Sequence, residues 1–277
     1  MKNIKEVVKE IVDAKKINSE NQVDKQQSDL SYEQQQCEWY NASEGDLNNF
    51  DGIECTICKN KGYIQFVNES GFISAKRCEC MERRKMFSEI KNSQQGLYIN
   101  LKASDYKRNS PWQEDIYQTM VKYCKANNND WFMICGQSGC GKTMIVNIIT
   151  NYLLFNKNEI VKYITWTDFI GELKRNLMSD NANITSTMLE EAEKAKILVI
   201  DELLKTFTEA DLKYIIEIIN YRYQHGLKTI ITSERSINDL LDIDEATFGR
   251  CIERCGEYLI YIPKDRSKNY RLRNIGR

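Results

Sequence analysis

The octapeptide from Gly136 to Thr143, GQSGCGKT, has the residue types and spacing of a phosphate-binding loop, G-x-x-x-x-G-K-[ST]. Its glycines let the backbone curl so that successive N–H groups face phosphate oxygens, and Lys142 can reach the β- and γ-phosphates. The Thr143 hydroxyl can ligate Mg²⁺. The apolar runs WFMIC and MIVNIITNYLL on either side predict the strand and the helix that such a loop requires. The sequence therefore predicts a site for a nucleoside triphosphate.

Asp201 and Glu202 follow the apolar run from Ile197 to Ile200, which predicts a buried strand ending in two carboxylates. At that edge of a sheet, Asp201 would hold Mg²⁺ through water, and Glu202 would orient or deprotonate the attacking water. Such a strand is weak evidence alone, because any strand can end in polar residues. Its position after the phosphate loop, with a single predicted strand between them, makes the signal specific.

Four of the ten cysteines form two close pairs, Cys55-x2-Cys58 and Cys78-x-Cys80. A structural zinc ion prefers four thiolate or imidazole ligands in a tetrahedron, and two such pairs supply four sulfurs with little backbone strain. The only histidine, His225, is far away in the sequence. The simplest prediction is a four-thiolate zinc site without an open coordination position. A set of ordinary buried thiols is the alternative, and the polar character of the segment disfavours it.

Three aromatic residues, Tyr63, Phe66 and Phe72, lie in the hairpin-length segment between the two cysteine pairs. They could stack on nucleic-acid bases, but packing beside the metal is the commoner case, so we expect them in a small core. Cys140 lies inside the phosphate loop with no histidine near it in sequence, and we do not expect it to act as a nucleophile.

Strand and helix signals alternate along residues 112–277, and this alternation predicts an α/β fold with a parallel sheet between helices. Five short β-branched or aromatic runs predict the strands: 131–135, 160–165, 197–200, 229–232 and 258–262. Near the N-terminus, a stripe formed by Ile4, Val7, Val8, Ile11 and Val12 predicts a short amphipathic helix. That helix could pack on its own domain or dock another protein. Residues 18–49 read as a loose helix or a flexible linker.

Composition excludes several classes of protein. The 277 residues carry 39 Lys and Arg against 40 Asp and Glu, which excludes a histone-like polybasic protein. No apolar run is long enough for a membrane helix, and charges run through the N-terminal segment where a signal peptide needs an apolar stretch. The ten cysteines come without an export signal, which favours reduced thiols and a metal site over disulfides. We therefore expect a cytoplasmic protein without a membrane partner.

Two segments are locally basic, residues 81–92 and the tail after Pro263. The tail contains Lys264, Arg266, Lys268, Arg271, Arg273 and Arg277 against the single acid Asp265. Either segment could bind phosphate backbones, although a run of charges is more often a solvated surface.

Residues 112–277 resemble the AAA+ domain of DnaC/DnaI-type replicative helicase loaders and of the related IstB transposition ATPases. The resemblance rests on GQSGCGKT, ILVIDEL, TIITSERS with the downstream LLDIDEATFGR, and NYRLR. The two cysteine pairs resemble the zinc-binding element ahead of the ATPase in DnaI-like and phage-type loaders. The implied fold is an AAA+ P-loop NTPase preceded by a small four-cysteine zinc module and an N-terminal helix.

The resemblance implies roles for individual residues. Lys142, Thr143, Asp201 and Glu202 would be the Walker residues, Ser233 and Glu234 would occupy the first sensor position, and Arg250 would reach the nucleotide of an adjacent subunit. Arg271 would be a second sensor. The expected nucleotide contacts are Gly136, Ser138, Gly139, Cys140, Gly141, Lys142, Thr143, Ser233 and Arg271. Related proteins often have Asn where this chain has Glu234, which leaves the sensor mechanism open. Lys174 and Arg175 lie where the loaders carry single-stranded DNA contacts.

The expected function is an ATPase that loads the hexameric replicative helicase onto single-stranded DNA and self-associates on ATP or DNA. Residues 1–92 would bind the helicase and contain the zinc module at about 50–82, residues 93–111 would be a linker, and residues 112–277 would be the ATPase domain. Expected cofactors are ATP, Mg²⁺ and Zn²⁺. The alternatives are an IstB-like transposition helper and a noncatalytic ATP-binding adaptor.

Overall fold

The computed structural model describes residues 30–92, 101–179 and 182–272, and the chain divides into two compact units after Met81. The expected N-terminal helix with its stripe from Ile4 to Val12 lies outside the described residues. No helix in the described part of the chain is long and apolar enough to cross a membrane.

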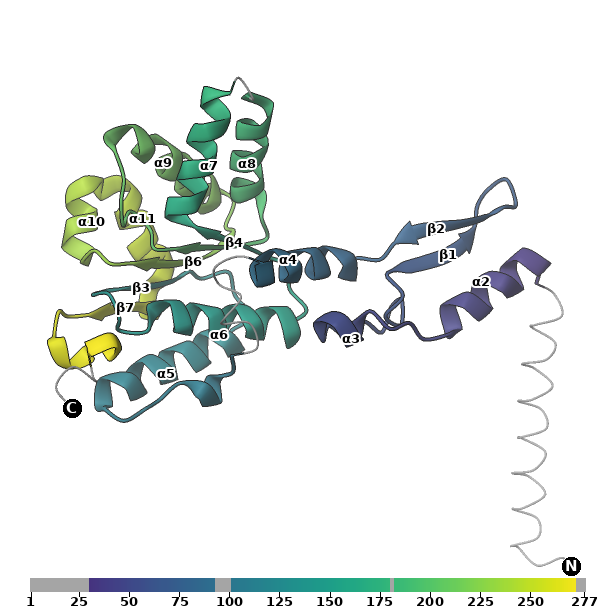
Figure 1. Ribbon diagram of the computed structural model, residues 1–277, viewed down its shortest axis with the longest axis horizontal. Coiled ribbons are helices and arrows are strands. Elements are labelled where there is room, and N and C mark those ends of the chain that lie inside the picture. Colours follow the sequence, from purple (N-terminus) through teal and green to yellow (C-terminus); the bar gives the residue numbers. More distant parts are fainter. Residues whose placement is uncertain (1–29, 93–100, 180–181, 273–277) are drawn as a thin grey trace, which may run out of the picture. The chain divides into compact units, whose positions relative to one another are not determined.

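The unit that begins at Glu82 is built on a five-stranded parallel sheet (Figure 1). Its strands are β3 (Phe132–Gly136), β4 (Val161–Thr165), β5 (Ile197–Asp201), β6 (Lys228–Ser233) and β7 (Leu259–Ile262), in the spatial order β4-β5-β6-β3-β7. These are the five strands that the apolar runs predict. Because the strands are parallel, the phosphate loop after β3 and the acids at the end of β5 lie at the same edge of the sheet, with the end of β6 between them.

Helices cover both faces of this sheet, as Figure 1 shows. On one face, α5 (Pro111–Lys125) and α6 (Lys142–Phe155) pack against the strands in one hydrophobic core. On the other face, the second core contains residues of α7 (Trp166–Met178), α8 (Ala182–Lys194), α9 (Glu209–Gln224), α10 (Ile237–Ile243) and α11 (Glu245–Cys255). Burial on both faces explains why the strands read as continuous apolar runs.

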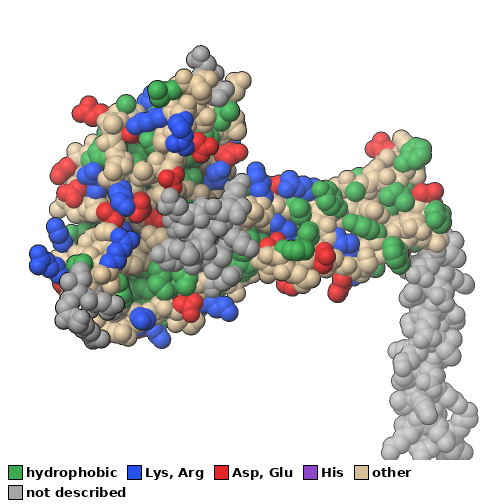
Figure 2. Space-filling model, viewed as in Figure 1, with side chains coloured by type: hydrophobic (Ala, Val, Ile, Leu, Met, Phe, Trp, Pro, Cys, Tyr) green, Lys and Arg blue, Asp and Glu red, His purple; other side chains and the backbone are tan. Residues whose placement is uncertain are grey.

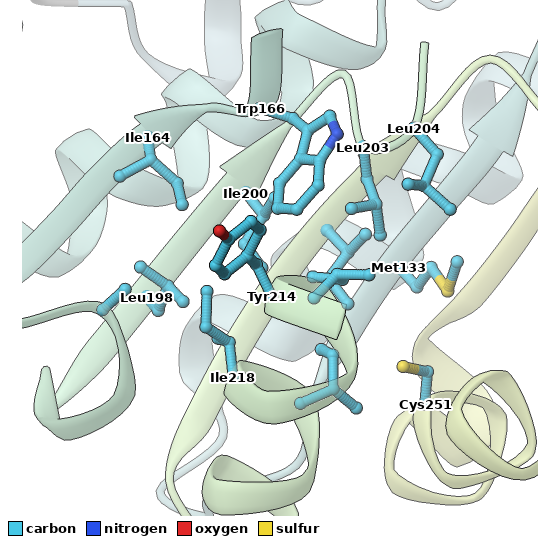
Figure 3. Packing of buried hydrophobic residues seen from close by; sticks show 14 of the residues in the cluster. Met133, Ile164, Trp166, Leu198, Ile200, Leu203, Leu204, Tyr214, Ile218 and Cys251 are labelled. Carbon is cyan, nitrogen blue, oxygen red and sulfur yellow. The ribbon is translucent and has the colours of Figure 1, made fainter. Parts of the chain in front are cut away.

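The second core also receives two leucines of the loop between β5 and α9. Figure 3 shows Leu203 and Leu204 close to Trp166 in this cluster. Both leucines are fully buried. These two side chains therefore anchor the loop that follows the acids in the second core.

The segment 101–110, which the sequence predicts to be part of a linker, packs on the core of the unit that begins at Glu82. Tyr106 is buried in the cluster that contains α5 and α6, and the Leu101 carbonyl accepts a hydrogen bond from Asn151 Nδ2 at 3.1 Å. A short 3-10 helix, η2 (Ala103–Asp105), lies between them in sequence. Earlier in the chain, α4 (Cys80–Asn92) places Phe87 edge-on against Phe155 of α6.

The first unit is a small module around an antiparallel hairpin, β1 (Tyr63–Val67) and β2 (Ile73–Arg77). The linker-like segment before it contains α2 (Tyr32–Ala42) and α3 (Asn48–Asp51). Asn41 at the end of α2 satisfies the outer edge of β1, since its amide donates to the Gln65 carbonyl at 2.8 Å and accepts from the Gln65 N–H at 3.0 Å. The side chain of Asn41 thus makes the two hydrogen bonds that a neighbouring strand would make to Gln65.

The expectation that the hairpin aromatics form a core is wrong. Tyr63, Phe66 and Phe72 are 46%, 41% and 70% exposed, and hydrophobic side chains are visible on the surface of this module in Figure 2. The physical reason is the size of the module: a two-stranded hairpin offers few buried positions, and the cysteine cluster with Ile64 and Met81 fills them.

A buried arginine fixes the end of α8. Arg222 is fully buried, and burial lowers its pKa to about 9. Its guanidinium donates to uncharged acceptors: the carbonyls of Ala192, Glu193, Ala195 and Lys228 and the hydroxyl of Thr229. Three of these carbonyls belong to the C-terminal turn of α8 and the residue after it, where helical carbonyls have no intrahelical partner.

We expect Arg222→Leu to lower the free energy of unfolding by about 3 kcal/mol, because several buried carbonyls would lose their donor at once. Urea unfolding followed by circular dichroism measures the change. Arg175→Leu is the matched control, since Arg175 is exposed and should change stability by less than about 0.5 kcal/mol. Equal stability of the two variants would contradict this account of the α8 terminus.

Candidate functional site

The phosphate loop joins β3 to α6 through three glycines with positive φ, Gly136, Gly139 and Gly141. At two of them, close approach also excludes a side chain. A Cβ on Gly136 would lie 2.7 Å from the Ile262 carbonyl oxygen of β7, and one on Gly139 would collide with the Asn269 amide. Only glycine fits this curled backbone, as the sequence motif predicts.

Lys142, the first residue of α6, is buried, and its ammonium folds back onto the loop. Its Nζ donates to the carbonyls of Gly136 at 2.7 Å and Gln137 at 2.8 Å. These carbonyls hold the cation at the mouth of the loop. A bound phosphate would compete with them for the ammonium protons.

Asp201, fully buried at the end of β5, receives hydrogen bonds from three strands or helices. Its carboxylate accepts from Thr143 Oγ1 at 3.4 Å, from the Tyr163 hydroxyl at 2.9 Å and from the Thr232 hydroxyl. Burial and the Asp201 charge raise the pKa of Tyr163 well above its usual value, so this phenol remains a donor. The Thr143 hydroxyl and the Asp201 carboxylate lie close together, so a Mg²⁺ bound by Thr143 would be within reach of Asp201 through a water ligand.

Glu202 begins the loop after β5 with φ of 56°, in the left-handed region. Its N–H donates to Thr232 Oγ1 at 2.9 Å, and its carboxylate accepts from Lys205 Nζ at 2.9 Å. This ion pair raises the pKa of Lys205. Thr232 therefore contacts both acids. Its role could not be predicted from the sequence, because a threonine is common in any β-branched strand.

A cavity of about 550 Å³ lies over the phosphate loop. Its walls include loop residues and the side of α6, together with residues from four other parts of the unit that begins at Glu82. The lining residues are Asp105, Tyr106, Lys107, Ser138, Gly139, Gly141, Lys142, Thr143, Met144, Glu202, Glu234, Tyr270 and Arg271. The volume suits a nucleotide-sized ligand, and three cations, Lys107, Lys142 and Arg271, suit an anionic one.

The C-terminal segment forms one wall of this cavity. The Tyr270 N–H donates to the Gly139 carbonyl at 2.8 Å, and Arg271 Nη1 donates to Ser138 Oγ at 3.3 Å. Tyr106 also lines the cavity, and its buried hydroxyl has no hydrogen-bond partner among the described residues. Burial raises the pKa of Tyr106, so the hydroxyl stays protonated. Tyr106 was not predicted to belong to the site, and Tyr270 was named only within the NYRLR segment, without a role of its own.

This cavity is not lined by four of the residues predicted to contact nucleotide or phosphate: Gly136, Cys140, Ser233 and Arg250. The Cys140 thiol points into the core beneath the loop and donates to the Gln137 carbonyl at 2.9 Å. Ser233 is buried, and its hydroxyl donates to the Leu203 carbonyl at 2.9 Å, whereas the neighbouring Glu234 lines the cavity. Arg250 lies in α11, where Nη1 donates to Asn220 Oδ1 at 2.6 Å. A contact of Arg250 with another subunit stays a prediction.

Several basic residues considered for DNA binding are engaged within the protein. Lys174 forms an ion pair with the buried Asp211 at 2.8 Å, and Arg83 and Arg84 are only 8% and 7% exposed. In the tail, Lys268 lies over the Trp112 ring. On the face drawn in Figure 2, basic and acidic side chains are interspersed over the unit that begins at Glu82. Arg273 and Arg277 lie outside the described residues.

The four cysteines Cys55, Cys58, Cys78 and Cys80 meet in one buried cluster, with all sulfurs within 4.8 Å of one another. The Sγ atoms are 3.7 Å apart for Cys55 and Cys78 and 3.5 Å apart for Cys58 and Cys80. Four thiolates bound to Zn²⁺ at 2.3 Å would be about 3.8 Å apart, so the cluster fits this metal. Burial opposes ionisation of Cys58, but the Gly62 N–H and the other thiols lower its pKa to about 7.

Comparison with protein families gives one match, IstB-like ATP binding protein, over residues 61–248. This range includes the phosphate loop, both acids and the strand β6. The chain belongs to the IstB-like ATP-binding protein family.

Two relatives of this IstB-like protein are known from Bacillus subtilis strain 168. The uncharacterized protein YqaM is 30% identical over 72% of this chain and 67% of its own length, and the phage-like element PBSX protein XkdC is 26% identical over 79% and 85%. Among solved structures, the fold is similar to that of the DnaC helicase loader, with a TM-score of 0.53, 21% identity and coverage of 60% of this chain and 98% of that one. It is also similar to the replication initiator DnaA bound to AMPPCP and single-stranded DNA, with a TM-score of 0.50, 17% identity and coverage of 61% and 51%. The predicted AAA+ P-loop architecture is confirmed.

Proposed function

We propose that this IstB-like protein is an ATP-dependent loader of the replicative DNA helicase. The observation that carries the proposal is the cavity over the phosphate loop, which Lys142, Glu202 and Arg271 all line. The similarity of the fold to nearly the whole of a DnaC helicase loader chain supports the helicase as the partner. The proposed division of labour places ATP in the unit that begins at Glu82 and the helicase on the N-terminal region.

In this proposal, the loop N–H groups and Lys142 bind the β- and γ-phosphates, and Thr143 and Asp201 hold the Mg²⁺. A magnesium ion at this site would neutralise charge on the phosphates. Glu202 orients the attacking water and accepts its proton. Thr232 restrains Asp201 and the Glu202 backbone together, and Arg271, which donates to Ser138 of the phosphate loop, stabilises charge on the phosphates. Arg250 would act on the nucleotide of an adjacent subunit.

The zinc module and the nucleic-acid contacts complete the proposal. The four cysteines would hold one structural Zn²⁺ that folds the module of residues 50–82. ATP-bound subunits would assemble and hold single-stranded DNA by backbone contacts that weaken with salt. Because Lys174 is paired with Asp211, we assign these contacts to other cations, with Arg175 the nearest exposed candidate.

A transposition helper is the second candidate, favoured by the family match itself, since the match is named for IstB-like proteins. The cysteine pairs favour the loader, because the zinc-binding element resembles that of loaders. A noncatalytic adaptor is disfavoured by the intact set of Lys142, Asp201 and Glu202.

Hydrolysis distinguishes an enzyme from an adaptor. We expect Glu202→Gln to lower the steady-state rate of ATP hydrolysis at least about tenfold and to leave ATP affinity within about twofold, because glutamine keeps the size but cannot take a proton. A phosphate-release assay and calorimetric titration measure the two quantities. An unchanged rate in this variant would exclude Glu202 as the base, and absent hydrolysis by the unaltered protein would favour the adaptor.

Capture experiments distinguish the loader from the transposition helper. The full chain, immobilised with ATP, should retain the purified replicative helicase of its own host and should not retain a transposase of that host. The reverse result would replace the proposed function by the second candidate.

A further inference from the structure

We propose that Arg235 is a positioning residue for Glu202, which it holds through the loop that connects β5 to α9. The inference rests on the proposed ATPase activity, since Glu202 is the proposed base, and adds a residue to which neither the motifs nor the comparisons assign a role.

The loop from Glu202 to Thr208 has an unfavourable backbone. Glu202 and Leu204 both have positive φ, 56° and 53°. A residue with a Cβ adopts this conformation only when its surroundings determine it, and strain of this kind is concentrated at functional sites. The position of the Glu202 carboxylate in the cavity wall therefore depends on what restrains the loop.

The end of β6 supplies the restraints. The Leu203 N–H donates to the Thr232 carbonyl at 2.8 Å, and the Ser233 hydroxyl donates to the Leu203 carbonyl at 2.9 Å. Next along the chain, Arg235 Nε donates to the Leu204 carbonyl at 2.8 Å. Consecutive peptide groups of the loop are thus bound by the last two residues of β6 and by Arg235, which lies just beyond the strand.

Arg235 makes the charged contact in this series. Its guanidinium also lies over the ring of Phe207, 4.9 Å from the centroid. The backbone N–H of Arg235 donates to the Ser233 hydroxyl at 3.2 Å. Arg235 therefore contacts the loop on both sides of Lys205, whose ammonium pairs with the Glu202 carboxylate. A charged donor binds a carbonyl more strongly than a neutral one does.

Loss of this contact should move Glu202 without unfolding the domain. Leu203 and Leu204 are anchored in the core independently of Arg235, as Figure 3 shows for both side chains. Without the donor, the Leu204 peptide can leave its left-handed conformation, and the carboxylate two residues earlier loses its fixed direction. The phosphate-binding residues lie in a different loop and keep their geometry.

The test uses the full chain with ATP and Mg²⁺. We expect Arg235→Met to lower kcat about tenfold with KM within twofold, because positioning of the base affects the chemical step and not uniform binding. In the Glu202→Gln background, Arg235→Met should lower the residual rate less than twofold, because the group that it positions is already inactive. Arg254→Met is the matched control, since Arg254 also donates to a backbone carbonyl, that of Asn129, and should leave kcat unchanged.

Hydrogen exchange gives a readout independent of hydrolysis. In Arg235→Met, amides of residues 202–207 should exchange at least tenfold faster, while amides of β5 and the melting temperature stay unchanged. Three results would each overturn the inference and leave the proposed function intact. They are an unchanged kcat in Arg235→Met, a rise in KM as large as the fall in kcat, and a tenfold fall in the residual rate when Arg235→Met is added to Glu202→Gln. If the unaltered protein does not hydrolyse ATP, the proposed function fails first, and the role of Arg235 fails with it.

Discussion

Lys142→Ala should abolish measurable nucleotide binding: we expect the dissociation constant for ATP with Mg²⁺ to rise at least about 100-fold, equivalent to about 2.7 kcal/mol. The buried ammonium of Lys142 is held at the loop by the carbonyls of Gly136 and Gln137, where a phosphate can take over its protons. Alanine removes the charge of the phosphate loop that faces the β- and γ-phosphates and leaves the loop with its backbone N–H groups. Isothermal titration calorimetry measures the change directly.

Lys157→Ala is the control for this substitution. Lys157 is half-buried and donates to Asn127 Oδ1 at 2.6 Å, and neither residue lines the cavity. Its affinity for ATP should equal that of the unaltered protein. Because a folded protein with bound nucleotide resists heating, the parent and the control should gain melting temperature with ATP, and Lys142→Ala should gain none. Retained ATP affinity in Lys142→Ala, with its fold intact by circular dichroism, would contradict the proposed binding mode.

Removal of the metal should unfold the N-terminal module. Among the described residues up to Met81, the buried hydrophobic side chains are Cys37, Ile53, Cys55, Cys58, Cys78 and Cys80, so four of the six are the predicted ligands. Metal binding to such a site contributes folding free energy of the order of 10 kcal/mol. We therefore expect Cys58→Ser or a strong chelator to release the zinc and to make the hairpin sensitive to protease.

Cys37→Ser is the matched control for the zinc site, because Cys37 is buried in the same module and is not part of the cluster. It should retain one equivalent of zinc by atomic emission spectroscopy. ATP affinity should survive in Cys58→Ser, since the unit that begins at Glu82 has its own two cores. A protein that contains no zinc when purified from zinc-replete cells, or a hairpin that stays protease-resistant in Cys58→Ser, would contradict a metal-stabilised module.

Acidification should release zinc from the cysteine cluster, as the chelator does. Zinc binds thiolates, so protons compete with the metal and affinity falls as the pH is lowered. The Gly62 N–H helps to lower the pKa of Cys58, whereas burial raises the pKa of Cys78, so the thiols of the cluster do not all shift in one direction.

Local patterns predicted the parts of this protein whose physics is local. The five strands were predictable because burial on both faces demands continuous apolar runs, and the phosphate loop was predictable because its function needs eight consecutive residues. The four cysteines were likewise readable as two close pairs. In each case, the residues that act together are neighbours in the sequence.

The wrong or missing predictions concern residues whose environment comes from elsewhere in the chain. Tyr63 and Phe72 were expected in a core, yet no second layer covers them within the described module. Tyr106 was assigned to a linker, yet it lies in a core and in the cavity wall. Lys174 was considered for DNA, yet a buried carboxylate 37 residues later holds it.

The amino-acid sequence determined the family, the parallel α/β architecture and the chemistry of triphosphate binding. The reason is that each buried strand and the curled glycine loop is formed by contiguous residues. Only the tertiary structure decided which side chains complete the site. Thr232 and Arg235 act on the acids because β6 lies beside β5, and Tyr270 and Arg271 reach the phosphate loop because the chain returns to it after β7. Contacts between distant segments depend on strand order and packing, which no local pattern of residues specifies.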